Sequence, residues 1–138
     1  MIHKGVNMKK QIIRCLITVL FLLVVSGCST VSSEKVTIYE MISFSETNME
    51  SKKIITNLKD INILETSFNG ASKNPGLTDM IDPNYKVELA EETYFLWINE
   101  ISGTIMNVND THITYTLTEK SVKEVNEVII SHFRIIKE

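Results

Sequence analysis

The chain of 138 residues carries 14 basic and 17 acidic side chains, 43% hydrophobic residues, 5 glycines and 2 prolines. This length fits one domain, and the composition excludes disordered, collagen-like and disulfide-rich proteins. The formal net charge of −3 argues against a nucleic-acid binder. The charge is unevenly distributed, because residues 1–27 hold 4 basic side chains and no acidic one, whereas residues 28–138 hold 10 basic and 17 acidic ones. A short basic leader therefore precedes an acidic domain.

Residues 1–27 have the pattern of a secretory signal peptide. Lysines follow Met8, and residues 15–25 form an apolar run of 11 residues. A membrane-spanning helix needs about 20 apolar residues, so this run has the length of a signal-peptide apolar region. A transmembrane anchor or a core helix is the alternative interpretation. Met8 is a more usual start for such a signal than Met1.

Val25, Ser26, Gly27 and Cys28 follow in register and resemble the lipobox of bacterial lipoproteins. The resemblance implies cleavage between Gly27 and Cys28 and a diacylglyceryl group on the Cys28 thiol. Two or more acyl chains hold a protein stably at a membrane, whereas one chain holds it weakly. Because Cys15 is removed with the leader, Cys28 is the one cysteine of the mature chain, and no intramolecular disulfide is expected. We expect a lipid anchor on the outer face of the cytoplasmic membrane.

Residues 28–35 are polar and aperiodic after the cysteine, and we expect a flexible tether there. Residues 36–138 are expected to form a single domain. Residues 36–39 alternate in polarity and predict a first strand that runs toward Phe44. A polar loop and a short strand at residues 54–56 are expected to follow.

A helix is predicted at residues 58–72, because apolar residues recur there every three or four positions. Its end is marked by Gly70, Asn74 and Pro75. The apolar positions are Leu58, Ile61, Leu64, Phe68 and Ala71.

Four strands are predicted next, at residues 85–89, 94–98, 104–108 and 112–117. Short turns join them, so they form an antiparallel meander. The unbroken apolar run at residues 94–98 is typical of a central strand covered on both faces.

A second helix is predicted near the C-terminus, with Val122, Val125, Ile129 and Phe133 as its apolar stripe. Thr118 or Ser121 offers an N-cap, and Ser121 with Glu124 fits a capping box. The predicted fold class is α+β: an antiparallel sheet, formed by the meander and the N-terminal strand, packed by two helices. The pattern leaves the strand order open.

Residues 74–80 (NPGLTDM), with Asp82-Pro83 and Tyr85 after them, resemble the YhfM-like domain of small Gram-positive lipoproteins. Residues 95–98 (FLWI) and 103–107 (GTIMN), followed by Asp110-Thr111 and Tyr115, carry the same resemblance, which covers residues 36–130. The resemblance implies a lipid-anchored surface domain. The family brings no assigned reaction, cofactor or ligand, so no catalytic residue is transferred.

Acidic side chains near a turn raise the question of a calcium site. Asp79 and Asp82 precede Glu88, Glu91 and Glu92. Calcium needs six to eight oxygens at fixed spacing, and the sequence has no Asp-x-Asp-x-Asp-Gly run. Aspartates beside proline are also ordinary turn formers. We therefore expect no metal site and no cofactor.

Asp110 and His112 suggest part of a catalytic triad. No Gly-x-Ser-x-Gly motif presents a nucleophile, and Asp110 falls in a predicted turn. A turn-capping aspartate and a half-exposed histidine are the favoured interpretation. The mature chain's other histidine, His132, is isolated from this pair in sequence.

Trp97 is the single tryptophan, and Tyr94 and Phe95 lie beside it. A surface aromatic platform binds sugars or peptides, whereas a two-sided strand buries such a residue in the core. We favour the core position. The aperiodic loop at residues 75–83 is the expected place of a ligand contact, so Asp79, Asp82 and Trp97 are the candidate contact residues.

The sequence predicts a non-enzymatic binding or accessory module, anchored by diacylglyceryl Cys28. Its expected partner is an envelope protein, a wall component or a peptide, and not nucleic acid. One alternative is a small surface hydrolase, in which Asp79, Asp82, Asp110 and His112 converge in a pocket walled by Trp97. Another is an inhibitor or immunity-type protein with a flat, exposed apolar patch. The acidic domain is expected to be repelled by an anionic membrane.

Overall fold

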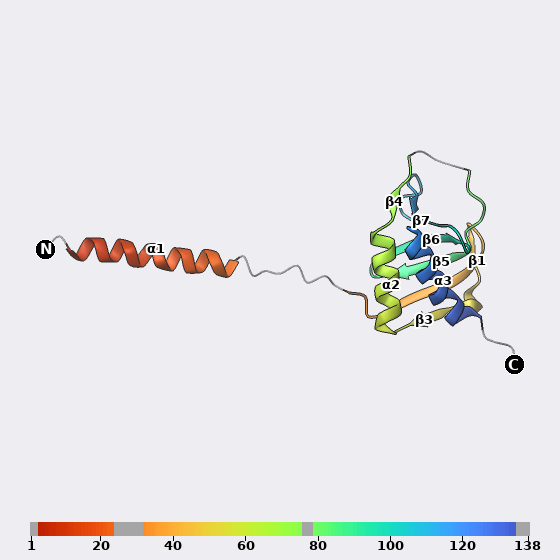
Figure 1. Ribbon diagram of the computed structural model, residues 1–138, viewed down its shortest axis with the longest axis horizontal. Helices are drawn as coiled ribbons and strands as arrows, with labels where there is room; N and C mark the ends of the chain where they lie inside the picture. The colour runs from red at the N-terminus through yellow and green to blue at the C-terminus, as the bar shows by residue number, and fades with distance from the viewer. Residues whose placement is uncertain (1–2, 24–31, 76–78, 135–138) are drawn as a thin grey trace. The chain divides into compact units, whose positions relative to one another are not determined.

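The computed structural model describes residues 3–23, 32–75 and 79–134, and the chain divides into two compact units (Figure 1). The first unit, residues 1–31, contains helix α1 (His3–Leu23), along which Ile12 and Leu16 are exposed. Among the described helices, none has the length and apolar character needed to cross a membrane. The predicted lipobox, with Cys28 and the cleavage position, lies outside the described residues.

The second unit, residues 32–138, is an α+β domain built on an antiparallel sheet, as predicted. In its described part the strand order is β2-β1-β5-β6-β7-β8-β4, and β3 also pairs with β1. The strands are β1 (Val36–Ser43), β2 (Glu46–Thr47), β3 (Lys53–Ile55), β4 (Ser72–Lys73), β5 (Tyr85–Leu89), β6 (Glu92–Ile98), β7 (Gly103–Asn107) and β8 (Tyr115–Thr116).

The predicted meander is confirmed, because β5, β6, β7 and β8 are neighbours in that order. The last strand is shorter than predicted: His112 lies in a turn, and only Tyr115 and Thr116 pair with β7. Three short elements were not predicted, namely β2, the 3-10 turn η1 (Met49–Ser51) and β4. Strands of two residues carry no readable alternation, and β4 exists because it pairs with the distant β8.

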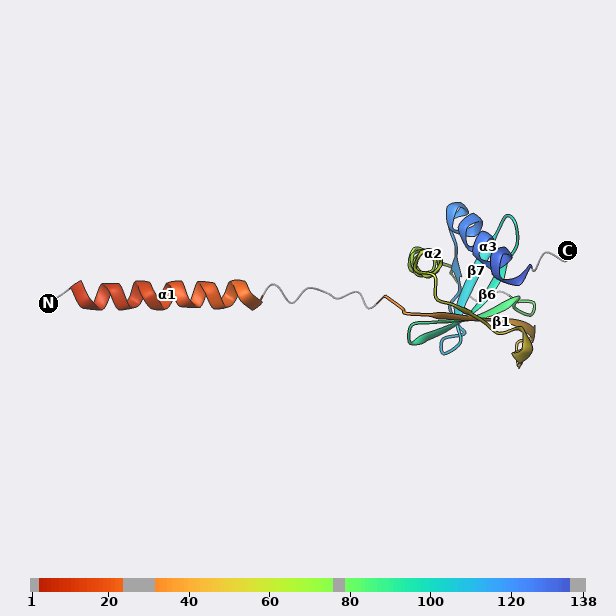
Figure 2. The same cartoon turned by 90° about the horizontal axis from the view of Figure 1, so that it is seen from below.

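Helices α2 (Leu58–Asn69) and α3 (Glu119–Phe133) lie side by side on one face of the sheet (Figure 2). The Asn57 side chain accepts hydrogen bonds from the first turn of α2 and caps it. Gly70 is the C-cap of α2, so Ala71, predicted as its last apolar position, lies beyond the helix and packs at the edge of the core.

The N-cap of α3 is Thr118, whose Oγ1 accepts a hydrogen bond from the backbone N–H of Ser121 at 3.1 Å. The predicted capping box of Ser121 and Glu124 is therefore wrong, because Ser121 already belongs to the first turn of the helix. The predicted stripe is confirmed: Val122, Val125 and Ile129 are buried.

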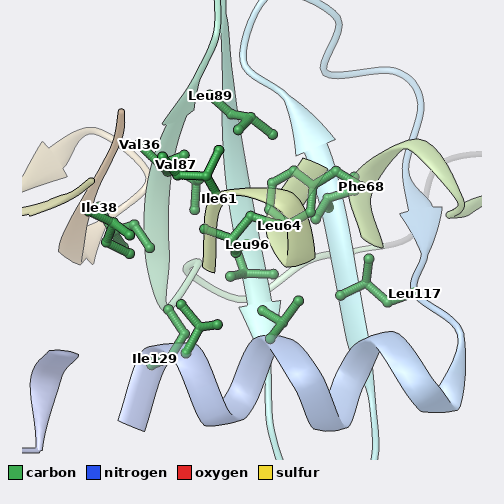
Figure 3. Close-up of a cluster of buried hydrophobic side chains, with 14 of the residues drawn as sticks. Val36, Ile38, Ile61, Leu64, Phe68, Val87, Leu89, Leu96, Leu117 and Ile129 are labelled. Atoms are coloured by element: carbon green, nitrogen blue, oxygen red, sulfur yellow. The ribbon is translucent and has the colours of Figure 1, made fainter. Parts of the chain in front are cut away.

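The core lies between the two helices and the sheet (Figure 3). Side chains from alternate strand positions meet the apolar stripes of both helices, and burial of this apolar area is the main favourable term for folding. The sheet contributes Val36, Ile38, Ile55, Val87, Leu89, Leu96 and Ile105, and the helices contribute Ile61, Leu64, Phe68, Val122, Val125, Val128 and Ile129.

The two ends of the sheet differ in what they carry. At the near end, where β1 begins, Val36 pairs with Leu89 beside the β5–β6 turn. At the far end lie the start of β5, the end of β6 and the β6–β7 turn. In Figure 3 the near end is at the top, by Leu89, and α3 crosses the strands at the bottom, toward the far end.

The chain enters this domain at the near end and is fixed there before β1 begins. Ser33 is 6% exposed, and its backbone N–H donates to Glu65 Oε1 of α2 at 2.6 Å. The ordered domain therefore includes Ser33, within the stretch that the sequence assigns to a flexible tether.

Candidate functional site

The face of the sheet opposite the helices carries a second, smaller apolar cluster. Residues that pair across antiparallel strands point to the same face, so Tyr39, Lys86, Phe95 and Met106 form one row on this outer face. Lys86 Nζ lies 4.7 Å from the centre of the Tyr39 ring, a cation–π contact. Tyr39 and Met106 are buried on this face, which is opposite the one covered by α2 and α3.

Trp97 belongs to this outer face and is covered there by two loops. The Phe44 ring lies 5.7 Å from the rings of both Phe95 and Trp97, measured between centroids. The Trp97 indole N–H donates to the backbone oxygen of Ile81 at 2.7 Å. Trp97 is consequently only 8% exposed, as a strand covered on both faces requires, and it does not offer an open platform.

The loop that carries Asp79 and Asp82 closes over Trp97. Asp82 Oδ1 accepts a hydrogen bond from the Phe44 backbone N–H at 3.0 Å, so Asp82 and Trp97 are brought together around Phe44. Asp79 is exposed. Phe44 and Ile81 are 38% and 79% exposed, so this loop region carries two exposed apolar side chains.

Asp110 and His112 lie elsewhere, in exposed turns that follow β7 at the near end of the sheet. Asp82 lies at the far end, next to Asn84, whose backbone N–H bonds to Leu96. The four polar residues proposed for a hydrolase are therefore not brought together. Within the described residues, no group of three or more His, Cys, Asp or Glu side chains is placed to hold a metal ion.

A groove of about 410 Å³ lies beside the core at the far end, and we call it the α3 groove. Its floor and walls come from α3, the start of β5 and the β6–β7 turn. The lining residues are Tyr85, Ile98, Asn99, Glu100, Lys123, Asn126, Glu127, Ile129, Ile130, Phe133 and Arg134.

Hydrogen bonds hold the two walls of the α3 groove together. Asn126 Nδ2 of α3 donates to the backbone oxygen of Asn99, and Asn99 Oδ1 accepts from the backbone N–H groups of Ile101 and Ser102 at 2.9 Å each. These bonds fix the β6–β7 turn against the helix. The walls of the groove are thus held by hydrogen bonds within the domain itself.

One end of the groove is aromatic. The rings of Tyr85 and Phe133 lie 5.2 Å apart between centroids, tilted by 54°. Burial raises the pKa of the Tyr85 phenol above 10.0, the negative charge of Glu40 raises it further, and Arg134 lowers it in part. The phenol therefore stays neutral at physiological pH and offers an O–H donor beside the Arg134 guanidinium.

The α3 groove is not apparent in the sequence pattern. The stripe of α3 identifies the residues that face the core, whereas Ile130 lies one position further and is 41% exposed in the groove. In the sequence, Ile130 is an apolar residue outside the core-facing stripe of the helix, and this is the one signal of the groove. It indicates an exposed apolar position on α3, but it does not indicate the second wall, which the β6–β7 turn supplies.

The fold and these surfaces define a small α+β domain with both helices on one face of the sheet and a groove beside the second helix. A family model described as YhfM protein matches residues 34–133. The chain belongs to the YhfM family, which confirms the predicted resemblance. Comparison with curated proteins and with solved structures gave no match.

Proposed function

We propose that this YhfM-family protein is a lipid-anchored, non-enzymatic binding module on the outer face of the cytoplasmic membrane of a Gram-positive bacterium. The α3 groove supports binding, because its walls are held together by hydrogen bonds and it joins apolar walls to polar side chains, as ligand sites do. The lipobox at residues 25–28 supports the anchor. Four residues separate Cys28 from the docked Ser33.

The positions of the polar candidates favour binding over hydrolysis. Asp82 is engaged by the Phe44 backbone, and Asp110 and His112 lie at the opposite end of the sheet. A triad needs its members within hydrogen-bond reach of one another. The candidate hydrolase residues therefore serve as turn and loop residues in this proposal, which involves no cofactor.

The anchor is tested by the intact mass of the protein extracted from membranes. We expect the mass of residues 28–138 plus a diacylglyceryl group, which is lost in Cys28→Ser. The Cys15→Ser variant is the matched control, because Cys15 lies in the segment that is removed, and its product should have the wild-type mass. An unmodified full-length chain in the membrane would overturn the proposal.

A further inference from the structure

We propose that the α3 groove binds an extended peptide segment that approaches from the side facing away from the membrane. The orientation rests on the proposed lipid anchor, whereas the binding chemistry rests on the groove alone. The ligand inserts an apolar side chain between Ile98, Ile130 and Phe133. Its backbone carbonyls accept the second N–H of the Asn99 and Asn126 amides, whose first N–H is used within the groove wall.

The place where the chain enters the domain sets the direction of approach. The five Cα–Cα steps from Cys28 to Ser33 reach at most about 18 Å when fully extended, so the near end of the sheet stays close to the lipid. The α3 groove lies at the far end, and no residue of α2, which holds Ser33, lines it. The groove therefore opens toward the cell wall, and lipid is not its ligand.

The length of the groove suits a short extended segment. Its lining on α3 runs from Lys123 to Arg134, which spans about 16 Å of helix. An extended chain rises about 3.3 Å per residue, so about five residues lie along it. The volume of about 410 Å³ exceeds that of one side chain and lies within the range of ligand sites.

The charges of the rim select against a polyanion. Two cationic residues, Lys123 and Arg134, and two anionic ones, Glu100 and Glu127, line the groove, so its formal charge is zero overall. A phosphate-rich wall polymer needs an excess of positive charge, as nucleic acids do. A peptide backbone needs neutral hydrogen-bonding partners. The Asn99 and Asn126 side chains each donate one N–H within the groove wall and carry a second N–H that a peptide carbonyl can accept.

The probe is a random library of peptides of about seven residues, displayed on phage and selected on the protein purified from membranes in detergent. We expect enriched sequences that share an apolar residue. Their affinity should fall about tenfold or more in Ile130→Asp, which places a charge on the groove wall. The matched control is Ile54→Asp, an exposed isoleucine of β3 outside the groove, which should bind like the wild type.

Ile130→Ala is the second variant, since it removes apolar area without adding charge and should weaken binding by a smaller factor. The proposal is overturned if no sequence is enriched, or if enriched peptides bind Ile130→Ala and the Ile54 control with equal affinity. Lipidation is scored separately by mass. If the wild-type protein binds peptide but carries no lipid, the proposed anchor is wrong and the proposed peptide site stands. If the protein carries the lipid but binds no peptide, the proposed peptide site is wrong and the anchor stands.

Discussion

Tyr85 joins the sheet to α3 and closes one end of the groove. It lies at the far end of β5, between Glu40 of β1 and Leu96 of β6, and its ring packs on Phe133. The pKa of its phenol is raised, first by burial and then by the charge of Glu40. The folded protein therefore holds the phenol proton more tightly than the unfolded chain does.

This difference predicts a loss of stability at alkaline pH. The contribution of neutral Tyr85 is complete below about pH 10, the pKa of an unfolded tyrosine, and is lost as the pH rises through the raised pKa of the folded state. Tyr94 acts in the same direction, because burial also raises its pKa. We expect urea unfolding to show a smaller stability loss between about pH 9 and pH 11 in Tyr85→Phe than in the wild type. An equal loss of stability in the variant and the wild type would contradict the raised pKa of Tyr85.

The burial of Trp97 could be predicted from the sequence, but the residues that cover its side chain could not. Its place in an apolar run indicates a strand covered on both faces, and the residue is indeed buried. The cover is not a helix but Phe44 and the loop at Ile81, two segments distant in sequence. Strand pattern predicts burial, whereas the identity of the cover depends on tertiary packing.

At the level of elements, the contact between α2 and α3 has one polar bond. His132 Nε2 lies 3.0 Å from Asp60 Oδ2, so the last turn of α3 is tied to the first turn of α2. The two side chains are 28% and 22% exposed. Partial burial reduces screening by solvent, so this pair should contribute more than an exposed ion pair.

A double-mutant cycle with His132→Ala and Asp60→Ala tests this contact. We expect a coupling free energy of about 0.5–1 kcal/mol near pH 6, measured by urea unfolding, which decreases at high salt. The control cycle uses Lys120 and Glu124, whose charged atoms are 3.9 Å apart on the exposed face of α3, and should give nearly zero. If both cycles give the same coupling free energy, the bond between His132 and Asp60 stabilises the domain no more than an exposed ion pair does.

The elements that the sequence predicted are those with several periods of an apolar pattern, namely the two domain helices and the longer strands. The short strands β2 and β4 depend on pairing partners supplied by the fold. The α3 groove has the same origin, because α3 supplies one wall and the β6–β7 turn supplies the other. A site formed between two elements needs their relative placement, which a pattern along the chain does not contain.

At the scale of the whole domain, the two ends of the sheet carry different features. The near end receives the chain at Ser33 and exposes acidic side chains such as Glu91 and Asp110. The far end carries the α3 groove. Because an anionic membrane repels the acidic near end, the tether is expected to hold the domain close without letting it lie on the lipid.

This arrangement predicts a fixed order of distances from the membrane. Glu91 and Ile101 lie in turns that flank the two ends of β6, about 20 Å apart, and both are exposed. If lipid occupies the Cys28 thiol, Glu91→Cys and Ile101→Cys each provide one free thiol for a fluorescent label. In vesicles with a headgroup quencher, we expect the label at position 91 to be quenched more strongly than the label at position 101.

Soluble iodide, which reaches both turns from water, is the control and should quench the two labels alike. Stronger quenching at position 101 by the lipid-bound quencher would place the α3 groove against the membrane and reject the approach of a peptide from the wall side.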